Sequence, residues 1–308
     1  MIIHASMRTD IPAFYSRWFL RRIREGFVCV RNPYNPSSVT RYRLSPDVVD
    51  LLAFCTKNPA PLLSHLDELS PYRQHWSITI TPYGKNIEPA VPAPDAVIFS
   101  FRELSSAIGA AHTAWRYDPI ILTPYWTIER HIAAFSQMAA ALEGVTETVM
   151  ASFLDLYPKV QRNFPEGRYI SPAERIQLGK ELIRIARRHG MRFIACAEGN
   201  SLARCGADCS GCFSKARLES IIGTPLSIPM GARVRKECPC IMGHDIGAYD
   251  SCPHFCRYCY ANSTPAAVRR NLPRHDPRSP FLLGHAHPGD VIHEAKQKSW
   301  IQPQMNLF

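Results

Sequence analysis

The chain has no long apolar run, and its first residues lack the features of an export signal. No stretch among its 308 residues is apolar for long enough to span a bilayer, so we expect no contact with a membrane. Residues 1–6 have neither a basic start nor a long apolar segment, so we expect no signal peptide. These absences predict a cytoplasmic protein.

Acidic residues are in the minority, and long runs of one charge are missing. Lys and Arg number 36 against 26 Asp and Glu, which gives a formal net charge of +10. A basic surface suits nucleic acid, phosphate-bearing ligands or an acidic partner. Many soluble proteins are also basic, however, and no Lys/Arg run exceeds two residues. Nucleic-acid binding is therefore an alternative that rests on charge alone.

Cysteine is scarce in the first 190 residues and crowded after them. Only Cys29 and Cys55 precede residue 190, and we expect both to be buried strand thiols. The other nine cysteines lie between Cys196 and Cys259. In a reducing compartment, clustered cysteines hold metal more often than they form disulfides. This distribution predicts metal chemistry in the C-terminal third.

Short apolar runs alternate with helical patterns across the first 200 residues, with no internal repeat. We expect strands at 2–6, 27–30, 49–54, 75–80, 113–115, 148–153 and 192–195, and helices at 14–24, 97–108, 128–142, 174–189 and, near the C-terminus, 291–298. One helix has a clear start, because Ser171 can be its N-cap, Pro172 suits the first position and Glu174 completes a capping box. The alternation predicts parallel strands joined by crossover helices.

Polar residues recur just after the predicted strands. They are Arg8, Asp10, Asn32, Lys57, Asn58, Thr81, Tyr83, Arg116, Asp118, Asp155, Lys159 and Glu198. Any one of them could be a helix cap or a loop ion pair, but in a (β/α) barrel all such positions converge on one mouth. We therefore predict an α/β fold with a TIM-type (β/α) barrel, complete or incomplete, over residues 1–199. Residues 200–308 are predicted to be a Cys-rich cluster-binding region and tail packed on the barrel.

The sharpest motif is Cys252-x3-Cys256-x2-Cys259, with Tyr258 before the last cysteine. Three thiolates on one tight loop can each bind one iron of a [4Fe–4S] cluster, which leaves the fourth iron open, whereas most electron carriers use four cysteines. This is the spacing of radical S-adenosylmethionine enzymes, in which the residue equivalent to Tyr258 packs on the adenine. A zinc knuckle, or an electron-transfer cluster completed by another cysteine, is the alternative.

Six further cysteines precede this motif. Cys205, Cys209 and Cys212 repeat its spacing without the aromatic residue, Cys238 and Cys240 form a C-x-C pair, and Cys196 ends the last predicted strand. They supply enough ligands for a second four-cysteine iron–sulfur cluster. A structural zinc held by four cysteines is the rival interpretation.

The whole chain, from about residue 3 to about residue 300, resembles the bacterial and archaeal family called domain of unknown function 1848. The resemblance is carried by the cysteine motif and by segments 6–15, 31–36, 56–59, 115–119, 152–157, 245–249 and 275–280. It implies roles for Cys196, Cys212, Cys238 and Cys240, which match family cysteines, but not for Cys205 and Cys209. Cys55 stands where the family has Trp, a change that we expect to affect core packing more than the site.

The resemblance and the motif together imply a radical S-adenosylmethionine-like enzyme of unknown substrate, in which the cofactor carries the hard chemistry. Cys252, Cys256 and Cys259 would hold the cluster, and Tyr258 would contact adenine. No Gly-Gly-Glu triplet is present, so Glu198 or backbone carbonyls would bind the methionine amino group. The expected substrate-binding residues are Arg8, Asp10, Lys57, Asn58, Arg116 and Asp118. A ferredoxin or flavodoxin would be the electron donor. The rival is a barrel protein with a structural or electron-transfer metal site.

Overall fold

Seven parallel strands form the central sheet of the computed structural model, which describes residues 1–229, 233–235 and 238–302. In spatial order they are β11 (His244–Asp245), β1 (Ile2–His4), β4 (Leu51–Thr56), β5 (Gln74–Thr79), β6 (Thr113–Ile120), β7 (Thr148–Phe153) and β8 (Arg192–Ala195). Every neighbouring pair in this sheet is parallel. The predicted α/β fold with parallel strands is confirmed.

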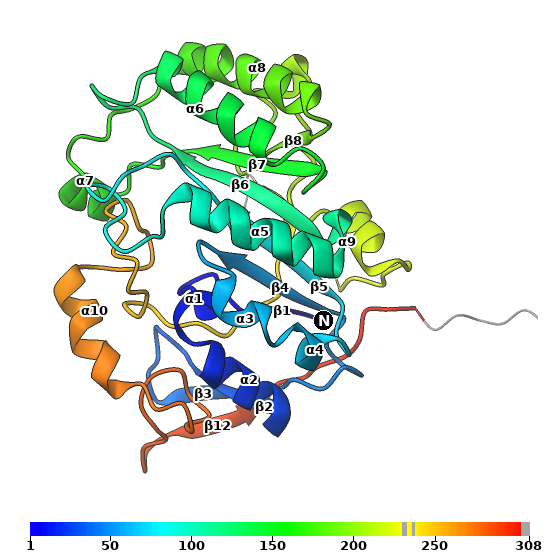
Figure 1. Cartoon of the computed structure of the whole chain (residues 1–308). Coiled ribbons are helices and arrows are strands. Elements are labelled where there is room, and N and C mark those ends of the chain that lie inside the picture. The colour runs from blue at the N-terminus through cyan, green and yellow to red at the C-terminus, as the bar shows by residue number, and fades with distance from the viewer. Residues whose placement is uncertain (230–232, 236–237, 303–308) are drawn as a thin grey trace, which may run out of the picture.

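Helices α5 (Pro94–Ile108), α6 (Ile128–Ala141) and α8 (Pro172–Arg188) connect neighbouring strands and lie along one face of the sheet (Figure 1). The other described helices are α1 (Ile11–Phe14), α2 (Ser16–Glu25), α3 (Ala60–Leu63), α4 (Leu66–Leu69), α7 (Pro158–Asn163), α9 (Lys215–Ile222) and α10 (Pro265–Asn271). The capping box of α8 forms as predicted, since Ser171 and Glu174 each accept a hydrogen bond from the other's backbone N–H.

The two faces of the sheet differ in side-chain size because consecutive strand residues point to opposite sides. Trp76 on β5 stacks on Phe54 with ring centroids 4.0 Å apart, and Trp115 on β6 stacks on Phe135 of α6 at 4.6 Å. Large aromatic rings thus fill the space beneath the helices. The opposite face of the same strands carries small or polar residues that line a cavity: Ala53, Cys55, Ser77, Thr79, Arg116 and Asp118.

A separate three-stranded sheet, β12–β3–β2, corrects two predictions. The strand expected at 27–30 does form, as β2 (Phe27–Arg31), but it pairs antiparallel with the unpredicted β3 (Ser38–Arg43) outside the central sheet. The helix predicted at 291–298 is wrong, because Val291–Glu294 is strand β12, parallel to β3. The adjacent β-branched residues Val291 and Ile292 favour an extended backbone, and β3 offers them a free edge.

Residues after 200 complete the edges of the central sheet. Asp208 bridges to Ile194 on β8, while β11 pairs with β1 at the opposite edge. Within the described ranges β8 and β11 are not hydrogen-bonded to each other, so the sheet is not shown to close. In the sequence, β8 and β11 are separated by α9 and by the antiparallel pair β9 (Arg233–Arg235) and β10 (Cys238–Ile241).

The stretches 1–199 and 200–308 share one apolar core. Leu218, Ile222 and Ile246 belong to the same cluster of buried side chains as Trp76 and Trp115. The division of the chain at residue 199 stays a prediction. Among the described helices, none is long and apolar enough to cross a bilayer.

Candidate functional site

A cavity of about 1050 Å³ lies on the inner face of the sheet, where the carboxyl ends of the strands meet the C-terminal cysteines. It gathers most of the polar residues that were predicted to converge there: Arg8, Asp10, Lys57, Arg116, Asp118, Asp155, Lys159 and Glu198. Tyr258, the predicted adenine contact, lines it too. Asn58 lies outside the lining, and its side-chain oxygen instead accepts a hydrogen bond of 3.3 Å from the backbone N–H of Ala60.

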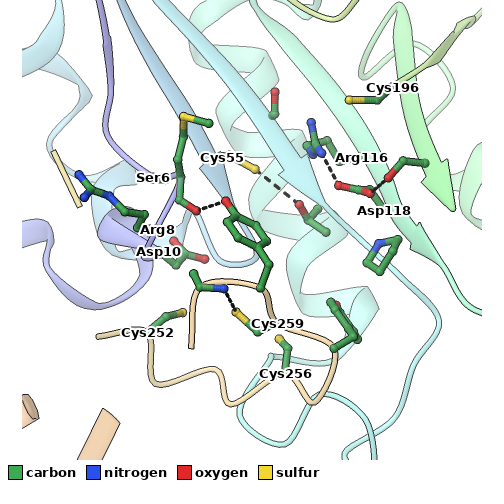
Figure 2. A pocket seen from close by; sticks show the side chains of 18 of the residues that line it. Ser6, Arg8, Asp10, Cys55, Arg116, Asp118, Cys196, Cys252, Cys256 and Cys259 are labelled. Atoms are coloured by element: carbon green, nitrogen blue, oxygen red, sulfur yellow. Dashed lines mark hydrogen bonds and ion pairs between the residues drawn. The ribbon is translucent and has the colours of Figure 1, made fainter. Parts of the chain in front are cut away.

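Residues 252–259, called the cysteine loop below, form one wall of this cavity. Figure 2 shows Cys252, Cys256 and Cys259 together on the loop, with Arg116 and Asp118 of β6 elsewhere around the pocket. All three thiols are half-buried and free of disulfides. Burial raises the pKa of Cys252 to about 12 and raises the pKa values of Cys256 and Cys259 as well. These thiols are therefore protonated at neutral pH unless a metal displaces the proton.

The backbone of the cysteine loop turns tightly beside its thiols. Phe255, just before Cys256, has φ of 56°, a left-handed conformation that costs a non-glycine residue about 1–2 kcal/mol. The backbone N–H of Ala261 donates a hydrogen bond of 3.3 Å to Cys259 Sγ, and such bonds to sulfur tune iron–sulfur centres. A tight turn, three thiols and an N–H donor fit the donor set that a cubane cluster requires.

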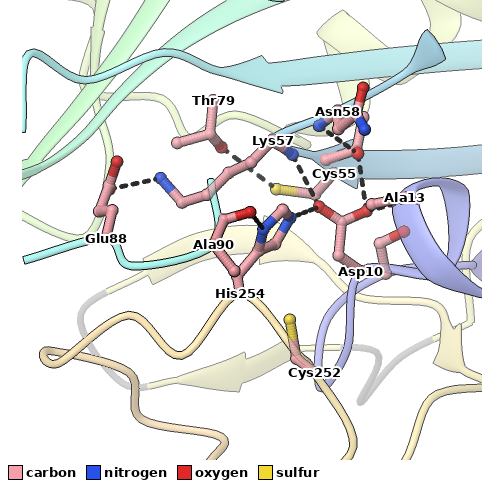
Figure 3. A network of polar contacts seen from close by, with 12 residues as sticks. Asp10, Ala13, Cys55, Lys57, Asn58, Thr79, Glu88, Ala90, Cys252 and His254 are labelled. Carbon is pink, nitrogen blue, oxygen red and sulfur yellow. Dashed lines mark hydrogen bonds and ion pairs between the residues drawn. The ribbon is translucent and has the colours of Figure 1, made fainter. Parts of the chain in front are cut away.

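His254 fastens the cysteine loop to the sheet through Asp10 (Figure 3). Its Nε2 lies 2.8 Å from Asp10 Oδ2. The same carboxylate accepts hydrogen bonds from the Thr56 hydroxyl at 2.6 Å and from the backbone N–H groups of Lys57 at 2.8 Å and Ala13 at 3.1 Å. Both oxygens of Asp10 are thus engaged by the protein, which suits a structural cross-link better than the substrate contact predicted for it.

Glu88 is a buried acid that was not predicted, and it ties Tyr258 to Lys57. The Lys57 ammonium and the Thr81 hydroxyl each donate to Glu88 Oε1 at 2.8 Å, and the Tyr258 hydroxyl donates to the same oxygen. Burial acts to lower the pKa of Lys57, but Glu88, Cys256 and Asp118 together outweigh burial and the pKa is raised, so Lys57 is charged. No local pattern marks Glu88, because Lys57 and Tyr258 lie 31 and 170 residues away in the chain.

The remaining charged residues that were predicted to bind substrate also form ion pairs within the protein. Arg8 pairs with Asp245 on β11, and Arg116 pairs with Asp118, which accepts a further hydrogen bond from the Ser152 hydroxyl. Arg116 keeps one buried donor, Nε, without a partner among the described residues.

Glu198 is held at the end of β8 rather than free to bind a cofactor amino group. One of its oxygens accepts the backbone N–H of Phe153 at 2.8 Å, and the other pairs with Arg175 at 2.5 Å. Burial raises the pKa of Glu198, although Arg175 opposes this effect. The side chain lines the cavity, but both of its oxygens already have partners.

The cysteines of the second set fall into two groups. Cys196, Cys212 and Cys240, called the thiol cluster below, line the cavity, with Sγ–Sγ distances of 3.9 Å from Cys196 to Cys212 and 3.4 Å from Cys212 to Cys240. Cys205 and Cys209 do not line it. The side chain of Cys238 lies outside the described residues. Across the described ranges, no three His, Cys, Asp or Glu side chains already surround one point as the ligands of a single ion do.

Cys55 departs from its predicted role. It lies on β4 as expected, but its half-buried thiol faces the cavity, 3.9 Å from the Thr79 hydroxyl. The side chain at position 55 therefore affects the volume of the site as well as the packing of the core.

Comparison with known proteins supports the assignment of a family. The family model described as Domain of unknown function (DUF1848) matches residues 2–261. The matched span starts in β1 and ends just after Cys259, so it contains the whole cavity wall from the first strand to the cysteine loop. No curated protein matches the chain.

Proposed function

We propose a function from the site itself, because the chain belongs to the DUF1848 family, whose function is unknown. The proposal is an iron–sulfur enzyme of the radical S-adenosylmethionine type, with its substrate bound in the central cavity. One observation carries it: the three cysteines of a C-x3-C-x2-C loop line a cavity of about 1050 Å³ at the carboxyl ends of parallel strands. When bound, a reduced [4Fe–4S] cluster would supply the electron that cleaves S-adenosylmethionine and starts hydrogen abstraction from the substrate.

Tyr258 would hold the adenine of such a cofactor. Its hydroxyl is fixed by Glu88, and Lys57 Nζ lies 5.7 Å from the centre of its ring. A ring that is anchored at its polar tip keeps its orientation without help from the ligand. Its face can then stack on a planar base, an interaction worth about 1–3 kcal/mol.

The open sheet supports an incomplete (β/α) barrel as the scaffold. From β1 to β8 the six successive parallel strands follow one another in chain order, as in a (β/α) barrel. Ligands of such scaffolds bind at the carboxyl ends of the strands. The cavity, the cysteine loop and the polar residues all lie at that end.

The rival functions have weaker support from the same site. An electron-transfer or structural cluster needs no neighbouring cavity of this size, whereas a substrate and a cofactor do. Four basic residues line the cavity, namely Arg8, Lys57, Arg116 and Lys159, against five acidic ones, Asp10, Asp118, Asp155, Glu198 and Asp245. Because these charges nearly balance, the cavity has no excess of positive charge to attract the backbone of a nucleic acid.

The test is anaerobic purification of the wild type and of a variant in which Cys252, Cys256 and Cys259 are all alanine. We expect the wild type to hold iron and labile sulfide and, once reduced, to cleave S-adenosylmethionine to 5′-deoxyadenosine, which chromatography detects. The triple variant should lose the cleavage, and Cys29→Ala, a buried thiol of β2, should keep it. A cluster-loaded, reduced wild type that shows neither cleavage nor a cofactor-dependent change in its paramagnetic resonance spectrum would rule the proposal out.

A further inference from the structure

The thiol cluster brings together three segments that are far apart in the sequence. Cys196 follows β8, Cys212 lies before α9 and Cys240 is on β10. Their sulfurs are 3.9 Å apart between Cys196 and Cys212 and 3.4 Å apart between Cys212 and Cys240. All three line the same cavity as the cysteine loop.

These two separations fit one kind of metal site better than another. A tetrahedral zinc ion holds each thiolate at about 2.3 Å, which places two sulfurs about 3.8 Å apart. In a cubane each thiolate binds a different iron, so its sulfurs are held much farther apart. We infer that the thiol cluster binds one thiophilic divalent ion of the zinc class, and not a second iron–sulfur cluster.

The local backbone is built to keep these sulfurs close. Gly211 has φ of +97°, and a Cβ there would come within 3.0 Å of Cys240 Sγ and 3.1 Å of the Pro239 ring. Only glycine therefore allows the segment of Cys212 to approach β10 this closely. The backbone N–H of Phe213 also donates a hydrogen bond of 3.4 Å to Cys240 Sγ, which stabilises a thiolate.

The charge of the site is compensated from β6. Three thiolates around one divalent ion leave a single negative charge in a buried place, which is costly without a partner. Arg116 is near enough to Cys196 and Cys212 to interact with both electrostatically. Its guanidinium, which also pairs with Asp118, thus lowers the cost of the negative charge of the filled site.

Only a small rearrangement separates the thiol cluster from a complete ligand shell. Cys212 already touches both partners, whereas the three sulfurs do not yet surround a common point. Rotation of Cys196 and Cys240 about their side-chain bonds toward Cys212 would bring the sulfurs around one ion. Such rotation is inexpensive for a short side chain between staggered positions.

Metal analysis of the triple variant of the cysteine loop tests this inference apart from the proposed function, since that variant lacks the ligands of the loop. Purified and analysed by mass spectrometry of its elements, it should retain about one zinc ion per chain and no labile sulfide. Adding Cys212→Ser should remove the zinc, while adding Cys209→Ser, a matched thiol in the same segment, should leave it in place. This result is independent of whether the wild type cleaves S-adenosylmethionine.

Cobalt replacement provides a second readout that needs no activity. Co²⁺ added to the zinc-free triple variant should give the intense visible bands of a tetrahedral thiolate site, and these should be lost with Cys212→Ser. If that serine variant fails to fold, the triple variant itself can be treated with a thiol-blocking reagent. Zinc should then be released in step with the modification of its remaining thiols. Iron with labile sulfide in the triple variant, or a Cys212–Cys240 disulfide in protein kept reduced, would overturn the inference.

Discussion

At the scale of single residues, the cavity is lined by charges that the protein has already paired. Of the residues predicted to bind substrate, Arg8, Lys57, Arg116 and Asp118 each form an ion pair, and Asp10 accepts four hydrogen bonds. Their positions at the strand ends could be predicted from the alternation of apolar and polar residues. Their partners could not, because Glu88 and Asp245 reach them only through the folded chain.

We predict that Asp10→Ala destabilises the protein, because the Asp10 carboxylate links His254 of the cysteine loop to the first turn of α1. Its loss leaves several buried donors unsatisfied, and we expect the free energy of unfolding to fall by about 3 kcal/mol. Urea unfolding followed by circular dichroism measures the change. Asp155→Ala is the matched control, since this exposed carboxylate of the cavity accepts a hydrogen bond of 3.2 Å from the Tyr157 hydroxyl and does not join two elements of the fold as Asp10 does. Equal losses for the two variants would contradict the cross-linking role.

Tyr258 should contribute its ring to cofactor binding and its hydroxyl to the placement of that ring. We predict that Tyr258→Ala keeps the iron content but weakens binding of S-adenosylmethionine about tenfold or more, as the loss of one stacking contact implies. Tyr258→Phe, which lacks only the bond to Glu88, should lose less. Calorimetric titration of the cluster-loaded variants gives both affinities. A Tyr258→Ala variant that binds as tightly as the wild type would show that the ring does not touch the cofactor.

At the scale of elements, most of the central strands were predictable, and the additions to the sheet edges were not. The strands around Phe54, Trp76 and Met150 are short apolar runs next to helices with clear periodicity, so their type follows from local pattern. By contrast, β11 has two residues and β12 a solvent-exposed edge. Both depend on pairing with strands some 240 or 250 residues away, and such pairing leaves no local signal.

The pairing of β11 with β1 should depend on Gly243. A Cβ at this position would lie 2.2 Å from the backbone oxygen of Ile2, so we predict that Gly243→Ala forces β11 away from β1 and costs about 1–3 kcal/mol. Thermal unfolding measures the loss. Gly84→Ala is the control, because nothing lies within 4 Å of a Cβ there and the position does not require a left-handed backbone. If Gly243→Ala is as stable as Gly84→Ala, residue 243 does not pack closely against the backbone of Ile2.

At the scale of the whole molecule, three buried histidines make the fold sensitive to acid. Burial lowers the pKa of His4 and of His131 to about 4 and that of His75 to about 3. His131 shows why: Nε2 must donate to the carbonyl of Ile121 at 2.7 Å, and Nδ1 accepts from the Tyr117 hydroxyl at 2.7 Å. The neutral ring is fully satisfied, and a second proton would place an uncompensated charge in a buried site and require the Tyr117 hydroxyl to turn from donor to acceptor.

The pH dependence follows from these lowered pKa values. The unfolded chain takes up protons on these histidines as the pH falls below their ordinary pKa of about 6.5, and the folded protein does not until about pH 4 or below. Stability should therefore be greatest above pH 7 and fall by about 2 kcal/mol per histidine between pH 7 and pH 5. Urea unfolding at the two pH values measures this difference in the free energy of unfolding. His131→Gln should make the difference smaller, and His287→Gln, which changes an exposed histidine, should not. If His131→Gln leaves the difference between pH 7 and pH 5 unchanged, His131 does not contribute to the loss of stability in acid.

The pairing of β1 with β11 also determines when the central sheet can be completed during synthesis. During synthesis β1 emerges among the first residues, but its partner is not made until residue 244, and the third cysteine of the loop comes later still. Domains fold from the N-terminus as the ribosome releases them, yet here β1 keeps one edge unpaired until residues 244–245 have been made. The proposed metal centre at the cysteine loop would therefore be filled only after residue 259 has been translated, since the loop and its wall of the cavity do not exist before then.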